Sequence, residues 1–331
     1  MIRYYLGVIK SSRTWFSPKS PIFIPVMSMI MCVMIAVAGI PLGSIQNSLA
    51  VETNGFIAAI DVVNAILLIT AINRSIRRAD YNFNYGYGKY ENLAILASAM
   101  LLTIVSGYIL VKTFQSIDNP TYVSNYWLLG SFSFVSLVMM ITMHHQQEIN
   151  AGKFNLPMLH YDVDLWKADI ITEIGVLINI IIGYALHYYN YLTIAKFVDS
   201  FTAVGLLVIA LRPCFKHGKE AFNQLLDRTL SEDIQIELLG VIAENIDEFC
   251  EFKSIHTRQS GNDLFIEMDL VMPFDYTLEE NYKVENKMRK SVLLKYPTSI
   301  FRLYAIPCPR DCIKGDQCFC PVKSKPSHNI N

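Results

Sequence analysis

The stretch GFIAAIDVVNAILLITAINR, residues 55–74, is the strongest indication of the fold. Twenty residues of this composition are long enough to cross the hydrocarbon core of a bilayer as one helix. Five further segments share this apolar character: residues 22–44, 92–116, 126–145, 165–187 and 195–212. The sequence therefore predicts an α-helical integral membrane protein with six transmembrane helices.

The composition supports a membrane protein with a soluble part. Of the 331 residues, 52% are hydrophobic and 17% are charged, whereas soluble domains average about 25% charged residues. The apolar runs lie in residues 22–212, and residues 213–331 have the composition of an ordinary soluble sequence. The net charge of -1 gives no support for a nucleic-acid partner, so the expected surroundings are the lipid bilayer.

This uneven composition divides the chain into five parts. They are a cytoplasmic N-terminal segment (1–21), a six-helix transmembrane domain (22–212), a connector (213–230), a cytoplasmic α+β domain (231–308) and a cysteine-containing C-terminal tail (309–331).

The basic residues predict the orientation of the spans. The loops after spans two and four and the stretch after span six are rich in Lys and Arg, as is the N-terminal segment, whereas the other three loops have almost none. Basic loops stay in the cytoplasm, so both termini are expected there. No cleavable signal is recognised, and the simplest location is a bacterial inner (cell) membrane.

Residues 231–308 have the pattern of a small α+β domain in the order helix–strand–strand–helix–strand. The helices are expected at 231–247 and 277–296, the second after a Thr277–Glu280 capping box. The strands are expected at 252–258, 263–271 and 299–306, with a turn at Ser260-Gly261-Asn262 between the first two.

Carboxyl and amide side chains form one stripe on each of two spans. In span two, Asn54, Asp61 and Asn64 share a helical face. In span five, Asp162, Asp169 and Glu173 do the same. Charged groups inside a membrane are costly and mark functional sites by default. The two stripes are expected to face each other and to form an oxygen-lined cation site.

Two purely structural roles for these carboxylates stay open. They could make structural hydrogen bonds, or, in the case of Asp162 and Asp164 near a span end, face interfacial water. The nearby Lys167 could also neutralise one of them.

Several motifs together resemble the cation diffusion facilitator transporters. They are SLAVETNGFIAAID (48–61), YGYGKYE (85–91), DVDLWKADIITEIG (162–175), Val198-Asp199-Ser200, and the TRQSGNDLFIEMDL and FRLYAIP segments of the C-terminal domain. The resemblance covers about residues 20–308. It implies export of a divalent metal cation in exchange for protons, a homodimer, and a metallochaperone-like cytoplasmic domain.

The chain departs from this family at most metal-ligand positions. The resemblance implies two ligands per helix, four residues apart, and Asp61 and Asp169 occupy the second position of each pair. The first positions hold Ile57 and Leu165, which cannot bind metal. Further family histidine positions fall on six other residues: Phe83, Tyr87, Lys253, Asp269, Tyr282 and Tyr304.

Two hypotheses follow from this loss of ligands. In the first, the transport site is shifted by one turn and uses Asp61, Asn64, Asp169 and Glu173, with Asp162 as a secondary candidate. Such an all-oxygen site favours harder ions such as manganese, magnesium or ferrous iron. In the second, the protein has lost transport and is a regulatory or scaffold membrane protein, for example a hetero-oligomeric partner. An enzyme is not expected, because no nucleophile–base pairing or phosphate-binding loop is found.

The C-terminal cysteines form a separate candidate site. Cys308, Cys312, Cys318 and Cys320 have the spacing C-x3-C-x5-C-x-C. Four cytosolic thiolates could bind zinc or a cuprous ion, although the spacing matches no common zinc signature. The alternative is a tail with reduced, inert thiols. No other cofactor is expected, since the divalent ion is the substrate.

Overall fold

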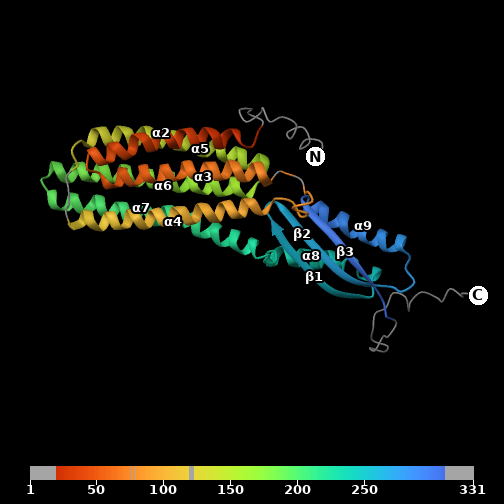
Figure 1. Cartoon of the computed structure of the whole chain (residues 1–331). Helices are drawn as coiled ribbons and strands as arrows, with labels where there is room; N and C mark the ends of the chain where they lie inside the picture. Colours follow the sequence, from red (N-terminus) through yellow and green to blue (C-terminus); the bar gives the residue numbers. More distant parts are fainter. Residues whose placement is uncertain (1–19, 76, 78, 119–122, 310–331) are drawn as a thin grey trace, which may run out of the picture. The chain divides into compact units, whose positions relative to one another are not determined.

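The computed structural model describes residues 20–75, 77, 79–118 and 123–309 (Figure 1). The chain divides into two compact units, one up to Phe222 and one from Asn223 onward. The first unit contains the long apolar helices, and the second contains the sheet.

The first unit is a bundle of six long helices (Figure 1). They are α2 (Phe23–Ile45), α3 (Leu49–Ser75), α4 (Lys89–Asp118), α5 (Tyr126–Phe154), α6 (Pro157–Tyr188) and α7 (Leu192–Leu225). Each contains an apolar stretch long enough to span a membrane, which confirms the predicted six-helix membrane fold. α7 passes through Pro213 to Leu225, so most of the predicted connector is helical.

The short turn between α5 and α6 shows how local sequence ends one helix and starts the next. Asn155 adopts a left-handed conformation (φ 50°) and its N–H bonds the carbonyl of Ala151, which closes α5. Pro157 then begins α6, at a position where a missing N–H costs nothing.

Two glycines let α2 and α3 pack closely. A Cβ atom at Gly55 would lie 2.7 Å from the backbone nitrogen of Ile40. A Cβ at Gly43 would overlap the backbone of Glu52. Small residues at such crossings allow helix backbones to approach within a membrane.

α3 also packs against α4 and α6, and this contact positions the polar stripes. The three helices share a buried core that includes Leu68 and Ile72 of α3, Leu102 of α4, and Leu159 of α6. With the helices packed in this way, Asp61 on α3 is within electrostatic range of Asp162 and Asp169 on α6.

The second unit is the predicted small α+β domain. Its elements are α8 (Glu232–Ala243), a 3-10 turn (Ile246–Glu248), β1 (Glu251–Ser260), β2 (Asp263–Met272), α9 (Leu278–Lys295) and β3 (Ser299–Pro307). The sheet order is β1-β2-β3, with β1 antiparallel and β3 parallel to β2. The parallel pair requires a crossover, which α9 provides.

The predicted local signals of this domain are present. Thr277 and Glu280 form a capping box at the start of α9. Gly261, with φ +60°, makes the turn between β1 and β2. Ser231 occupies the N-cap position of α8, but its side chain makes no capping hydrogen bond.

Candidate functional site

Four carboxyl groups of the membrane unit lie near one another, and we call them the acidic cluster: Asp61 of α3, and Asp162, Asp169 and Glu173 of α6. Asp61, Asp162 and Asp169 are mutually within electrostatic range, and Glu173 is within range of Asp169. Asp162, Asp169 and Glu173 are 8%, 7% and 0% exposed. The predicted stripes on α3 and α6 therefore come together at this cluster.

Within the described residues, no basic side chain neutralises the acidic cluster. The ion pairs of the described membrane unit join Lys112 to Glu52, Lys216 and His217 to Asp164, and His217 to Glu220. Lys167, a possible counter-charge on sequence grounds, is exposed and makes no ion pair in the described part of the chain. The cluster thus lacks a positive partner among the residues that the structure describes.

Two oxygens of the cluster make no hydrogen bond of good geometry. Within the described residues these are Asp162 Oδ2 and Glu173 Oε1, both buried, although Trp166 and Ser133 lie close enough to interact with Asp162 and Glu173 respectively. The other Glu173 oxygen, Oε2, accepts a hydrogen bond from Asn54 Nδ2. Buried polar atoms are nearly always paired, so these carboxylate oxygens are the ones that a cation, a proton or water would satisfy.

The two asparagines of α3 act as donors in this geometry. Asn54 donates to Glu173. Asn64 Nδ2 donates to Asp61 Oδ1 at 3.2 Å, while its carbonyl oxygen accepts from Ser98 Oγ at 2.8 Å. An NH2 group cannot bind a cation, so Asn64 would have to turn its side chain to become a ligand. Its predicted role as a ligand stays a prediction.

Cys32 of α2 joins the surroundings of the acidic cluster, a neighbour that the sequence did not predict. It is 3% exposed, lies in a core shared with Ala58 and Trp166, and is within electrostatic range of Asp61, Asp162 and Asp169. One cysteine in an apolar helix carries no sequence signal of such a neighbourhood. A thiol is a softer ligand than a carboxylate, but within the described residues Cys32 and the carboxyl groups are not arranged to hold a metal ion together.

The first positions of the family's ligand pairs lie in the apolar core, as their side chains predict. Ile57 and Leu165 are 2% and 7% exposed. Among the described residues, no three His, Cys, Asp or Glu side chains are arranged to hold a metal together. A bound ion would therefore require the side chains of the cluster to rearrange around it.

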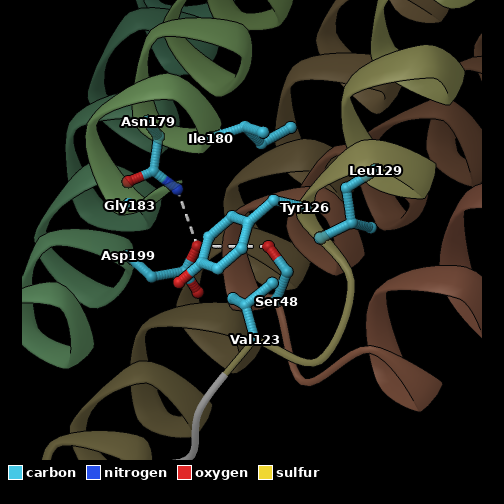
Figure 2. A pocket seen from close by; sticks show the side chains of 8 residues that line it. All are labelled: Ser48, Val123, Tyr126, Leu129, Asn179, Ile180, Gly183 and Asp199. Atoms are coloured by element: carbon cyan, nitrogen blue, oxygen red, sulfur yellow. Dashed lines mark hydrogen bonds between the residues drawn. The ribbon is translucent and has the colours of Figure 1, made fainter. Parts of the chain in front are cut away.

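A second carboxylate, Asp199 of α7, is surrounded very differently (Figure 2). It accepts hydrogen bonds from Ser48 Oγ (3.1 Å), Asn179 Nδ2 (2.7 Å) and the backbone nitrogens of Leu49 (2.6 Å) and Ala50 (3.4 Å). The last two are the first N–H groups of α3, so Asp199 caps that helix at its positive end.

A small pocket, partly open to its surroundings and with room for about one water molecule, lies beside Asp199 (Figure 2). Tyr126 and Leu129 of α5 and Asn179, Ile180 and Gly183 of α6 line it, together with Ser48, Val123 and Asp199. Because the oxygens of Asp199 are occupied by donors of the protein, the pocket offers no free charged ligand among the residues that line it.

Aromatic side chains occupy the loop between α3 and α4, where the resemblance implied histidines. The ring of Phe83 contacts those of Tyr87 and Tyr90, with centroids 4.6 Å and 6.1 Å apart. Tyr87 Oη donates to Asp80 Oδ2 at 2.7 Å, and this bond, helped by the Phe83 N–H, lowers the pKa of Asp80. Ring contacts and the Tyr87–Asp80 hydrogen bond hold this loop.

In the cytoplasmic domain, the family histidine positions hold Lys253, Asp269, Tyr282 and Tyr304. Among the described residues, no group of His, Cys, Asp or Glu side chains there is arranged to hold a metal ion. Asp269, for example, accepts a hydrogen bond from Ser254 at 2.6 Å. Of the tail cysteines, Cys308 is a free, half-buried thiol, and its N–H bonds the carbonyl of Met272. Cys312, Cys318 and Cys320 lie outside the described residues, so metal binding by this group stays a prediction.

Comparison with known proteins identifies the family to which this chain belongs. A model of the cation efflux transmembrane domain matches residues 25–226, and a model of the cation efflux protein cytoplasmic domain matches residues 231–301. The chain belongs to the cation diffusion facilitator family. It is therefore a multi-pass membrane transporter of the cation efflux type and not an enzyme, and the resemblance stated from its motifs is confirmed.

Individual relatives agree with this assignment. The cation-efflux pump FieF of Escherichia fergusonii is 25% identical over 249 residues, which cover 75% of this chain and 80% of the relative. The FieF pumps of Shigella flexneri and Escherichia coli O127:H6 are each 24% identical over the same lengths.

Proposed function

We propose that this protein exports a divalent metal cation from the cytoplasm in exchange for protons, and that the ion binds at the acidic cluster. Asp61 and Asp169 are its principal ligands, with Glu173 and Asp162 as supplementary ones. The observation that carries the proposal is the absence of any basic partner for these four carboxyl groups among the described residues.

Charge balance links the cluster to both ion and protons. Four carboxylates without a counter-charge are unstable inside a membrane unless a cation or protons neutralise them. Because a metal and protons compete for the same oxygens, binding of one releases the other. This competition supports exchange of a cytoplasmic ion for external protons, with the helices rocking around the site.

The basic loops and the relatives support an orientation, a membrane and an oligomeric state for this activity. The loops rich in Lys and Arg support cytoplasmic termini, and hence a cytoplasmic α+β domain. The named relatives are bacterial pumps, which supports a bacterial inner membrane as the location. The matched cytoplasmic domain supports a homodimer joined through this part of the chain.

The test is ion flux into sealed vesicles. The purified protein is reconstituted with a metal-sensitive dye inside, and zinc, ferrous iron, manganese and cobalt are offered under a proton gradient. Flux of at least one ion is expected, and Asp61→Ala and Asp169→Ala should each abolish it. Asp164→Asn is the matched control, because it removes a carboxylate of α6 that already pairs with Lys216 and His217 outside the cluster.

One observation favours a second function, the regulatory or scaffold role. Ile57 and Leu165 replace two ligands, and no closed ligand set exists among the described residues. A properly folded dimer that moves none of the four ions would overturn transport and favour this alternative. Co-purification with an active relative from the same cell would then test a hetero-oligomeric role.

A further inference from the structure

A chain of hydrogen bonds reaches Asp61 from the side of α4. Tyr161 Oη of α6 lies 2.8 Å from Ser98 Oγ of α4, and Ser98 Oγ donates to Asn64 Oδ1 at 2.8 Å. Asn64 Nδ2 in turn donates to Asp61 Oδ1 at 3.2 Å. Tyr161, Ser98 and Asn64 are 1%, 0% and 4% exposed, so the chain is sealed from solvent within the bundle.

The number of protons on each group sets the direction of these hydrogen bonds. A serine hydroxyl has one proton, and Ser98 gives its proton to the carbonyl oxygen of Asn64. Tyr161 is therefore the donor to Ser98. Every bond then donates toward Asp61, which ends the chain as an acceptor. A row of hydrogen bonds in which each member donates to the next fixes the orientation of the group at its end.

The same chain holds Asn64 in one orientation. With its oxygen bonded to Ser98, the amide presents only N–H groups to Asp61. Turning the amide would place its carbonyl oxygen against Asp61, so the bond to the carboxyl group would be lost. The helices α3, α4 and α6 thus each contribute one member, and Cys214 Sγ of α7 lies 3.5 Å from Tyr161 Oη.

We propose that Tyr161, Ser98 and Asn64 are positioning residues that hold the Asp61 carboxyl group in the orientation that binds the transported cation. Asn64 serves as a donor to Asp61 and not as a ligand of the ion. This inference rests on the proposed function, because it assigns a role toward the ion that Asp61 binds. It predicts that groups which never touch the ion control its affinity, as outer partners of metal ligands do.

The test separates affinity from rate in the vesicle assay. Tyr161→Phe and Ser98→Ala each remove one hydroxyl and almost no other volume. Each should raise the KM for the ion by about 10-fold, within the range typical of outer partners of metal ligands, with little change in maximal rate. Ser98→Thr keeps a hydroxyl and should retain most of the wild-type affinity.

Ser106→Ala is the matched control. Ser106 lies on the same helix, is 2% exposed, and its hydroxyl has no hydrogen-bond partner among the described residues. This variant should keep the wild-type KM. Thermal unfolding of all variants in detergent shows whether any change in KM merely follows a loss of stability.

The outcomes divide cleanly between the two proposals. If Tyr161→Phe and Ser98→Ala lose stability but keep the wild-type KM, the row of hydrogen bonds only stabilises the packing of the helices, and the positioning role is wrong. If Ser106→Ala raises KM as much as Ser98→Ala, the effect belongs to α4 in general and the role is again wrong. A wild-type protein that neither binds nor moves an ion overturns the proposed function together with this inference.

Discussion

Asp199 and the acidic cluster are two ways of placing carboxylates in one helix bundle. Asp199 receives hydrogen bonds from two side chains and from two backbone N–H groups at the start of α3. Asp162 and Glu173 each keep a buried oxygen without a hydrogen bond of good geometry among the described residues, and no basic side chain there balances their cluster. Both kinds of carboxylate look alike in the sequence.

The number of hydrogen bonds that each carboxylate receives distinguishes a structural role from a functional one. A carboxylate whose oxygens are filled by the protein stabilises the fold and has nothing left to offer an ion. One that lacks partners lowers stability and is retained for another purpose. On this criterion Asp199 is structural, and we propose the acidic cluster as the functional site.

The largest expected effect that tests this comparison is on stability. Asp199→Ala removes a cap of α3 and leaves several donors unpaired, so it should destabilise the protein by about 2–4 kcal/mol. Asp169→Asn should leave stability unchanged or raise it, because it removes repulsion from Asp61 and Asp162. Thermal unfolding of the purified protein in detergent measures both. Equal losses in the two variants would contradict the distinction.

An intermediate effect is expected at the ion pair between Lys112 and Glu52. Lys112 Nζ lies 2.5 Å from Glu52 Oε1, and their side chains are 35% and 10% exposed. Lys112→Met leaves Glu52 as an unpaired, mostly buried charge and should cost about 1–2 kcal/mol, less than the roughly 3–5 kcal/mol of a fully buried pair. Adding Glu52→Gln should restore part of this loss.

A double-mutant cycle with the two single variants measures the coupling between Lys112 and Glu52. Additive losses would show that Glu52 does not depend on Lys112. In that case Glu52 would be grouped with the acidic cluster rather than with Asp199.

The smallest expected effect is at Asp80 in the loop after α3. Its pKa is lowered mainly by the hydrogen bond from Tyr87, so the contribution of this bond is present above the ordinary Asp pKa of about 3.9. It is lost as the pH falls through the lowered pKa. Tyr87→Phe should therefore speed hydrogen exchange of the Asn82 and Phe83 amides, which bond Asp80, at about pH 7.

The same comparison at about pH 3, with intrinsic exchange rates taken into account, should show a smaller difference between Tyr87→Phe and the wild type. A difference that is as large in acid as at neutral pH would mean that ring packing with Phe83 and Tyr90 holds the loop, and not the carboxylate.

Much of the architecture is predictable because its signals are local. The length of each apolar run predicts a span. The Thr277–Glu280 pair predicts the start of α9, and the turn at Gly261 predicts a hairpin. Spacing along a helix likewise places Asp162, Asp169 and Glu173 on one face, whatever lies opposite.

The amino-acid order alone thus specifies the six spans, the succession of elements in the soluble domain, the family and the faces on which the acids lie. Which of those acids have partners is visible only in the packed bundle. Packing placed Cys32 beside the cluster, kept Lys167 away from it, satisfied Asp199 and turned the amide of Asn64 toward Asp61. The reason is physical: periodicity fixes the direction of a side chain about its own helix, whereas its partners depend on how neighbouring helices are rotated and how closely they pack.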